Sequence, residues 1–399
     1  MKILMVNKFL YPAGGAETYM FGLGDYLKSL GHQVEYFGMY SDNNCVSNSI
    51  NCLTDNIDFK NASLTDKLKY SLKTIYSKEA AIKIGKVIEA FKPDVVHLNN
   101  INFQLTPSII YEIKKHNIPI VQTVHDVQIA CPNHRMYNEA SEKICSACAD
   151  GKFINCTKHK CVHGSSLKSL IASIESYYYH SKGTYNLVDA YICPSRFMAD
   201  TIIRAGVSSE KTTVIHNYCS RYGPLKPKSN DNDYVLYFGR LSIEKGIKTL
   251  TDVCKELPDI NFIFAGTGDL EKLCQGIDNV KCVGFKSGNE LNELIRNAKF
   301  SVCPSVCYEN CPMSIIESLS LGTPVIVSDL GGAPELIENG KTGFIFKAYD
   351  KTDLKNKILN LYSNQELIDK MSESCIELSS NTIEKYTEKL LEIYNSVRR

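Results

Sequence analysis

The sequence lacks the features that would place the protein across a membrane or on a nucleic acid. It has no apolar run of about 18 residues, so we expect no segment to span a bilayer. The apolar start, residues 1–10, is too short for a secretory signal and predicts a buried first strand instead. A formal net charge of +1 over 399 residues disfavours nucleic acid as the main partner. We therefore expect a cytoplasmic location.

The sequence also lacks the three-glycine fingerprint of a dinucleotide-binding enzyme. The loop after the first strand candidate has only two adjacent glycines, Gly14 and Gly15. The other candidate, AGTGDLE, has Glu271 where the third glycine would stand. A nicotinamide-dependent enzyme is therefore disfavoured. Taken alone, Gly14 and Gly15 are equally compatible with a tight turn from a strand into a helix.

Apolar strand candidates alternate with helical stretches in two successive sets. This alternation predicts an α/β fold of two parallel-sheet domains, and 399 residues exceed what one core usually organises. We predict a Rossmann-like domain over residues 1–215, a linker over 216–233 rich in Pro, Ser, Asn and Asp, and a second Rossmann-like domain over 234–380. The strand candidates are 3–7, 34–37, 95–98, 120–124 and 189–194, then 234–238, 260–265, 281–283, 300–303 and 324–328.

Two glutamates, Glu309 and Glu317, stand eight residues apart in the stretch PSVCYENCPMSIIES. The first follows an apolar strand candidate, and the second lies on the helix that begins near Pro312. A helix N-terminus favours a phosphate, and carboxylates accept hydrogen bonds from sugar or ribose hydroxyls. An isolated pair of this kind is more often solvated surface charge, so the neighbouring motifs decide between the two interpretations.

A second motif, YFGRLSIEKG, lies at the carboxyl end of the strand candidate 234–238. Gly239 allows a sharp exit from the strand, and Arg240 and Lys245 follow before a helix. Ligands bind at this end of the strands in open α/β sheets, and two cations there suit a diphosphate. Taken alone, the two residues are equally compatible with solvated loop cations. Phe285, which follows Gly284 at another strand end, is where the backbone would contact a base.

Five ordered landmarks carry a resemblance to a known family. They are PxGGAE (12–17), the pair His125–Asp126, FGR…EKG, AGTG and the two glutamates spaced E-x7-E. In this order, over nearly the whole chain, they resemble the retaining glycosyltransferases of family 4. The resemblance implies the GT-B fold, in which two Rossmann-like domains face each other across a cleft. It also implies that the last segment, 381–399, forms a helix that returns to the first domain.

The resemblance assigns roles to individual residues. Arg240 and Lys245 would hold the donor diphosphate, Glu317 the ribose, and Glu309 the sugar hydroxyls, with His125 beside the donor sugar but not as a general base. The departing phosphate would take the acceptor's proton in a front-face mechanism that needs no metal. The expected catalytic residues are Arg240, Lys245, Glu309 and His125, and the expected donor-binding residues are Gly14, Gly15, Gly239, Arg240, Lys245, Gly284, Phe285, Glu309, Asn310, Cys311, Pro312 and Glu317.

A cysteine-rich insertion, residues 131–163, departs from the minimal pattern of the family. Cys145-x2-Cys148 followed by Cys156-x4-Cys161 has the spacing of a metal knuckle, and the segment holds little material for a core. In a reducing compartment a zinc ion cross-links such a segment more stably than disulfides do. The sequence predicts a structural zinc site at these four cysteines, with Cys131 or His159 as alternates. Unligated cysteines, disulfides and redox sensing stay open.

The sequence therefore predicts a retaining hexosyltransferase that uses a nucleotide-diphosphate sugar, with UDP as the expected nucleotide. The acceptor would be a growing cell-surface or capsular glycan, carried on a lipid, and no cofactor would act in catalysis. An amphipathic helix over 165–185 would rest on the membrane, although such a stripe more often faces a core. Two alternatives stay open: a catalytically idle GT-B scaffold that binds partners through the cysteine-rich insertion, and a GT-B sugar-nucleotide epimerase.

Overall fold

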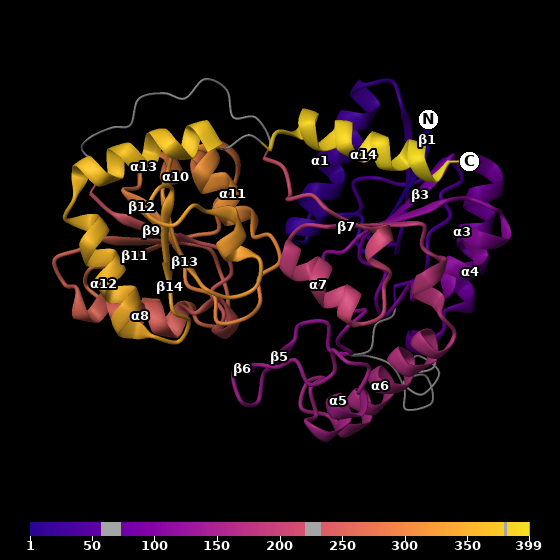
Figure 1. Cartoon of the computed structure of the whole chain (residues 1–399), viewed down its shortest axis with the longest axis horizontal. Helices are drawn as coiled ribbons and strands as arrows, with labels where there is room; N and C mark the ends of the chain where they lie inside the picture. The colour runs from indigo at the N-terminus through magenta and orange to yellow at the C-terminus, as the bar shows by residue number, and fades with distance from the viewer. Residues whose placement is uncertain (57–72, 220–232, 379–380, 399) are drawn as a thin grey trace. The chain divides into compact units, whose positions relative to one another are not determined.

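The computed structural model describes residues 1–56, 73–219, 233–378 and 381–398. The chain divides into two compact units, the first made of Met1–Ser141, Cys145–His216 and Ile383–Arg399, the second of Glu142–Ile144 and Asn217–Thr382. Most of the predicted linker, at residues 220–232, lies outside the described residues. Each unit is a parallel sheet with helices on both faces (Figure 1).

In the described residues, the sheet of the first unit has six strands in the order β2-β1-β3-β4-β7-β8, all parallel. The strands are β1 (Lys2–Val6), β2 (Gln33–Phe37), β3 (Val95–Leu98), β4 (Ile120–Thr123), β7 (Ala190–Cys193) and β8 (Thr212–Val214). The helices are α1 (Gly15–Ser29), α3 (Lys78–Phe91), α4 (Ser108–Lys115), α5 (Ile154–Lys158), α6 (Ser166–Ser181), α7 (Arg196–Arg204) and α14 (Ile383–Val397). A short hairpin of β5 (Tyr137–Asn138) and β6 (Lys143–Ile144) precedes α5.

The last helix, α14, packs on the first unit. Its Tyr386 hydroxyl hydrogen-bonds the Tyr19 hydroxyl on α1 at 2.6 Å, and its Tyr394 hydroxyl reaches His97 Nδ1 on β3 at 2.5 Å. Both tyrosines are fully buried, so their aromatic surface adds to the core while each hydroxyl keeps a partner. The end of the chain thus belongs to the first unit.

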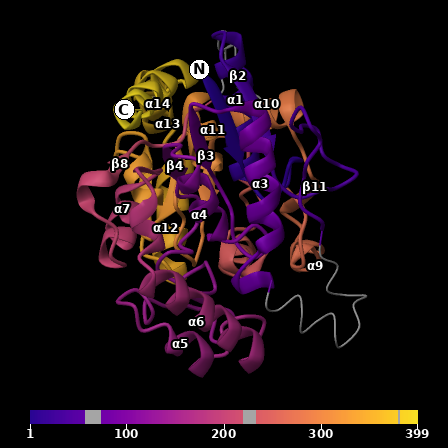
Figure 2. The ribbon, with the colours of Figure 1, turned by 90° about the vertical axis from the view of Figure 1, so that its right-hand side faces the viewer.

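The cysteine-rich insertion lies at one end of the first unit, where α5 and α6 run side by side (Figures 1 and 2). Ser165 caps α6 by accepting a hydrogen bond from the Lys168 amide. The Ser173 hydroxyl on α6 hydrogen-bonds Thr157 Oγ1 at 2.9 Å and donates to the Phe153 carbonyl at 2.8 Å, which joins α6 to the α5 segment.

The sheet of the second unit repeats the architecture, with described strands in the order β11-β10-β9-β12-β13-β14, again all parallel. The strands are β9 (Val235–Phe238), β10 (Phe262–Ala265), β11 (Val280–Gly284), β12 (Phe300–Cys303), β13 (Val325–Ser328) and β14 (Gly343–Phe346). The helices are α8 (Ile247–Glu256), α9 (Glu271–Cys274), α10 (Gly288–Asn297), α11 (Met313–Ser320), α12 (Lys351–Tyr362) and α13 (Gln365–Leu378).

The pleat of β9 explains why both faces of this sheet are covered. Val235 and Tyr237 belong to a core shared with α8, α12 and α13, whereas Leu236 and Phe238 pack with α10 on the opposite side. Successive side chains of a strand point to opposite faces, so a strand that is apolar throughout needs helices on both sides. The predicted fold of two Rossmann-like parallel-sheet domains is confirmed.

Candidate functional site

The second unit has the geometry of a ligand-binding site at the point where its strand order reverses. The chain runs outward from β9 through β10 to β11, then returns to β12 on the other side of β9. The loops that follow β9 and β12 therefore leave the sheet in opposite directions, and the crevice between two such loops is where open α/β sheets bind ligands. A backbone hydrogen bond from the Val306 amide to the Glu244 carbonyl, 2.9 Å long, joins these two loops.

Lys245 and Glu309 form an ion pair across this crevice, one from each loop. Lys245 Nζ lies 2.5 Å from Glu309 Oε1, and the Ser305 hydroxyl donates to the same oxygen at 2.5 Å. The Glu309 side chain is only 11% exposed. Burial alone would raise the pKa of Glu309, but Lys245 and Ser305 hold it below its usual value. Burial would likewise lower the pKa of Lys245, and Glu309 raises it instead, so both groups stay charged.

Arg240 differs from Lys245 because its side chain is largely exposed. Its side chain is 63% exposed, and its contact with Glu244 is a long one of 4.0 Å. Such an exposed pair contributes little to stability, so a ligand phosphate can take its place. The loop itself is fixed, since the Tyr237 hydroxyl donates to the Arg240 carbonyl at 2.6 Å. A guanidinium on a fixed backbone suits a planar, bidentate contact with phosphate oxygens.

Two glycines allow the loops of this site to come close. Gly246, directly after Lys245, has φ +73°, and a Cβ there would lie 1.8 Å from the Pro304 carbonyl oxygen. Gly331, in the GGAPEL stretch after β13, has φ +66°, and a Cβ would lie 2.2 Å from the Glu309 carbonyl oxygen. Neither position tolerates a side chain. The GGAPEL stretch therefore supports the Glu309 backbone, to whose carbonyl the Gly332 amide donates a hydrogen bond 2.7 Å long.

Glu317 lies on α11, the helix that begins after Pro312, as the sequence predicted. No hydrogen bond or ion pair of its carboxylate occurs within the described part of the chain. Burial raises its pKa to about 7. An acceptor on this helix that has no protein partner in the described residues is available to the hydroxyls of a ligand.

The remaining predicted donor residues lie around the same sheet edge. Gly239 directly follows β9, Gly284 is the last residue of β11, and Phe285 is 73% exposed. Parallel strands bring these ends to one edge. Asn310, Cys311 and Pro312 form the segment between the two glutamates, where the buried Cys311 accepts hydrogen bonds from Asn217, the backbone amide to its sulfur and the side-chain amide to its carbonyl.

In the first unit, His125 lies at the carboxyl end of β4, where the sequence placed it. Its Nε2 lies 2.9 Å from Asn99 Oδ1, and its ring packs edge-on against Tyr19. The amide oxygen can only accept, so Nε2 carries the proton. Burial lowers the pKa of His125 to about 3, which keeps the ring neutral. A neutral imidazole can hydrogen-bond a sugar hydroxyl but adds no positive charge.

Asp126, next to His125, belongs to a buried network that the sequence did not reveal. Asn102 Nδ2 donates to Asp126 Oδ2 at 2.7 Å and lies 2.9 Å from His134 Nδ1. Lys8 Nζ donates to Asn102 Oδ1 at 2.7 Å. Because His134 belongs to the cysteine-rich insertion, this network joins the insertion to the His125–Asp126 pair.

Gly14 and Gly15 stand at the start of α1, above the end of β1. Gly14 has φ −179°, an extended conformation open to any residue, so the turn itself does not require glycine. Glu17 in the first turn is buried and accepts a hydrogen bond from Asn7 Nδ2 at 2.9 Å. This bond ties α1 to the end of β1, and the two glycines leave a backbone surface without side chains.

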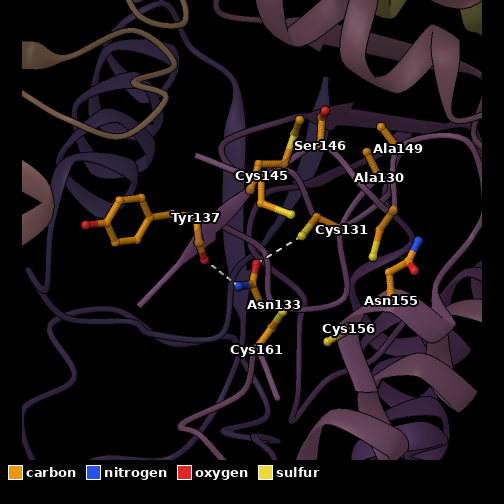
Figure 3. Close-up of a pocket in the computed structure, with 12 residues that line it drawn as sticks. Ala130, Cys131, Asn133, Tyr137, Cys145, Ser146, Ala149, Asn155, Cys156 and Cys161 are labelled. Carbon is orange, nitrogen blue, oxygen red and sulfur yellow. Dashed lines mark hydrogen bonds between the residues drawn. The ribbon is translucent and has the colours of Figure 1, made fainter. Parts of the chain in front are cut away.

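The four cysteines predicted to bind zinc line one small cavity, together with Cys131 (Figure 3). All are free thiols. His159 does not line this cavity. In the described residues, no three His, Cys, Asp or Glu side chains are already arranged to hold a metal ion. The zinc site therefore stays a prediction at this point.

Comparisons with known proteins give the family. The family described as "Glycosyltransferase Family 4" matches residues 13–219, and that described as "Glycosyl transferases group 1" matches residues 225–377. The chain belongs to glycosyltransferase family 4, and it has the GT-B fold. The first family match covers the unit that holds His125, and the second covers the crevice of Lys245 and Glu309.

The individual proteins compared next are 17–29% identical to this chain. The chain is 29% identical over 224 residues to the uncharacterized glycosyltransferase MJ1178 of Methanocaldococcus jannaschii, which covers 55% of this chain and 62% of that protein. It is 25% identical over 356 residues to an uncharacterized 42.6 kDa protein in the cps region of Klebsiella pneumoniae, covering 84% and 87% of the two chains. Anabaena Alr3699/HepE, solved in complex with UDP, has a TM-score of 0.69 at 17% identity over 99% of this chain and 100% of that chain.

Proposed function

We propose that the protein is a retaining hexosyltransferase that moves a sugar from UDP to a growing capsular or cell-surface glycan. The observation that carries the proposal is the Lys245–Glu309 ion pair, in the same loop system as the exposed Arg240, in the switch-point crevice of a family 4 chain. HepE, of the same fold, binds UDP, and the Klebsiella relative belongs to a cps region, which support the donor and the product class.

In the proposed reaction, the two cations stabilise the departing diphosphate. Charge builds on the β-phosphate as the glycosidic bond breaks, and Lys245, fixed by Glu309, is already aimed before that charge appears. Arg240 swings onto the same phosphate. The leaving phosphate takes the proton of the acceptor hydroxyl on the same face of the sugar, so the anomeric configuration is retained. Glu309, Glu317 and His125 position hydroxyls, which aligns donor and acceptor.

The stereochemical outcome tests this mechanism. The protein is incubated with an α-linked UDP-sugar and an acceptor glycan, and NMR follows the anomeric proton of the product. We expect an α-linked product. A β-linked product would contradict retention. Release of an isomerised sugar nucleotide would favour the epimerase, and donor binding without any turnover would favour the idle scaffold.

The pH dependence of donor binding tests the role of Glu317. The raised pKa of Glu317 means that the folded protein binds this proton more tightly than the unfolded chain does. The resulting stabilisation is present at low pH and is lost as pH rises through about 7. Ribose hydroxyls donate to the ionised form, and we expect UDP-sugar affinity to rise about tenfold between roughly pH 5.5 and 7.5. A sugar nucleotide has no phosphate that titrates in this range. The Glu317→Gln variant should lose the slope; an equal slope in the variant would remove Glu317 from the ribose site.

We also propose that the protein acts at the membrane surface, where a lipid-linked acceptor would be presented. No helix among the described residues is long and apolar enough to cross a bilayer. One face of α6 nevertheless exposes an apolar stripe at helical spacing, with the exposed Lys158, Lys160 and Lys168 in the same segment. The stripe consists of Leu167, Leu170, Ile174 and Tyr177.

Vesicle flotation tests the membrane contact. The wild-type protein should float with vesicles containing anionic lipid and much less with neutral ones, because lysines add attraction only to the former. The double variant Leu167→Ser/Ile174→Ser should lose most of this binding. Ile82→Ser is the matched control, since Ile82 is exposed on α3 outside the stripe. Equal flotation of both variants would contradict the assignment of this face.

A further inference from the structure

Five cysteines from separate parts of the insertion surround one cavity. Cys131 follows β4, Cys145 and Cys148 follow β6, Cys156 lies on α5, and Cys161 comes after it. The cavity has a volume of about 10 Å³, enough for one water molecule or one ion (Figure 3). Thiols bind water poorly, so the lining suits an ion that prefers sulfur better than it suits water.

Four of the five sulfurs form a mutually close set. Cys131, Cys148, Cys156 and Cys161 each lie near enough to the other three for their charges to interact. Of these four, Cys148 also interacts in this way with Cys145. This set has Cys131 in place of the Cys145 that sequence spacing suggested. The fold brings Cys131, which lies 14 residues before Cys145, beside the other three cysteines.

One hydrophobic cluster of the segment is small and rich in cysteine. Its buried members in the described residues are Cys148, Phe153 and Cys156. Small modules of this kind usually depend on a metal or on disulfides.

We propose that Cys131, Cys148, Cys156 and Cys161 bind one structural zinc ion. The four thiols turn inward about their Cα–Cβ bonds, lose four protons to solvent and coordinate Zn²⁺ as a tetrahedral tetrathiolate. The Cys131 sulfur gives up its present hydrogen bond to Asn133 Oδ1, 2.9 Å long. The ion fixes the turn that carries His134, and through Asn102 it positions Asp126.

Elemental analysis tests the site in the full chain, purified from cells without added metal. We expect one zinc per chain in the wild-type protein and in Cys145→Ser, which alters a thiol of the same cavity outside the proposed set. Zinc content should fall at least tenfold in Cys131→Ser and Cys156→Ser. Zinc-free, folded wild-type protein would overturn the proposal, as would loss of zinc from Cys145→Ser with retention in Cys131→Ser.

Two further measurements keep the test decisive if a variant fails to fold. Cobalt added to metal-stripped wild-type protein should give the absorption bands of a tetrahedral tetrathiolate site, and their absence would overturn the proposal. Mass spectrometry of the non-reduced, denatured chain should find all four thiols free after the metal is removed. A Cys156–Cys161 disulfide in its place, two hydrogens lighter, would assign the cluster to redox chemistry and also overturn it.

Discussion

Replacing Lys245 with alanine is expected to reduce turnover with UDP-sugar by about 10² to 10³, the loss typical of one preorganised charge at a developing oxyanion. Lys245 is held 2.5 Å from Glu309 before any ligand binds, so its cost of reorganisation during the reaction is small. Initial rates over a range of donor concentrations would separate kcat from KM. The reduction should fall mainly on kcat, because the charge on the phosphate grows in the transition state.

Lys248→Ala is the control for this variant. Lys248 lies in the first turn of α8 and is exposed, and its replacement removes the same charge from the same segment. Its turnover should match the wild type. If Lys245→Ala retains full turnover while remaining folded, Lys245 does not contact the leaving group and the diphosphate clamp is wrong.

Replacing Glu309 with glutamine is expected to affect stability and activity together. The amide keeps the shape of the side chain but leaves the Lys245 ammonium without its charged partner. We expect the free energy of unfolding to fall by about 1.5–3 kcal/mol at pH 7, as for other hydrogen bonds to charged groups. Donor affinity and kcat should fall as well, since Lys245 is then no longer fixed.

The sign of the pH dependence distinguishes this effect from a packing defect. The pKa of Glu309 is lowered in the folded protein, so its stabilising contribution is present above about pH 4.5 and is lost as pH falls through the lowered value. The difference between wild type and Glu309→Gln, measured by denaturant unfolding, should therefore shrink in acid. A difference that is the same in acid would indicate altered packing.

A double-mutant cycle gives the coupling directly. Lys245→Ala, Glu309→Gln and their combination should show a coupling energy of about 1–3 kcal/mol in unfolding, as expected for residues in contact. Additive effects would mean that the pair contributes nothing to stability.

The site motifs are visible in the sequence because they are local. The FGR…EKG loop, the E-x7-E spacing and the helix after Pro312 are each read within about ten residues. The ion pair could not be predicted from the sequence, because Lys245 and Glu309 are 64 residues apart and meet only because β9 and β12 are neighbours. Ser305 gave no signal of its own, as a serine four residues before a glutamate is common in loops.

The fold class was predicted correctly, but two strands at the sheet edges were missed. Strands β8 and β14 were not predicted, and both lie at the edge of a sheet. β8 reads TTV and is only partly buried, so it lacks the apolar run that marked the central strands. The Asn102–Asp126–His134 network was also missed, because three residues from different loops show no periodicity in sequence.

Nucleotide binding tests the central claim most directly. Thermal unfolding of the full chain would be followed with UDP, GDP, ADP and their common sugar conjugates. A ligand at about 100 times its dissociation constant adds roughly 2.7 kcal/mol, which shifts the melting temperature by a few degrees. We predict a shift with UDP and its sugars, absent with the other nucleotides and weakened in Lys245→Ala. No shift with any nucleotide, in a folded sample, would contradict the donor site.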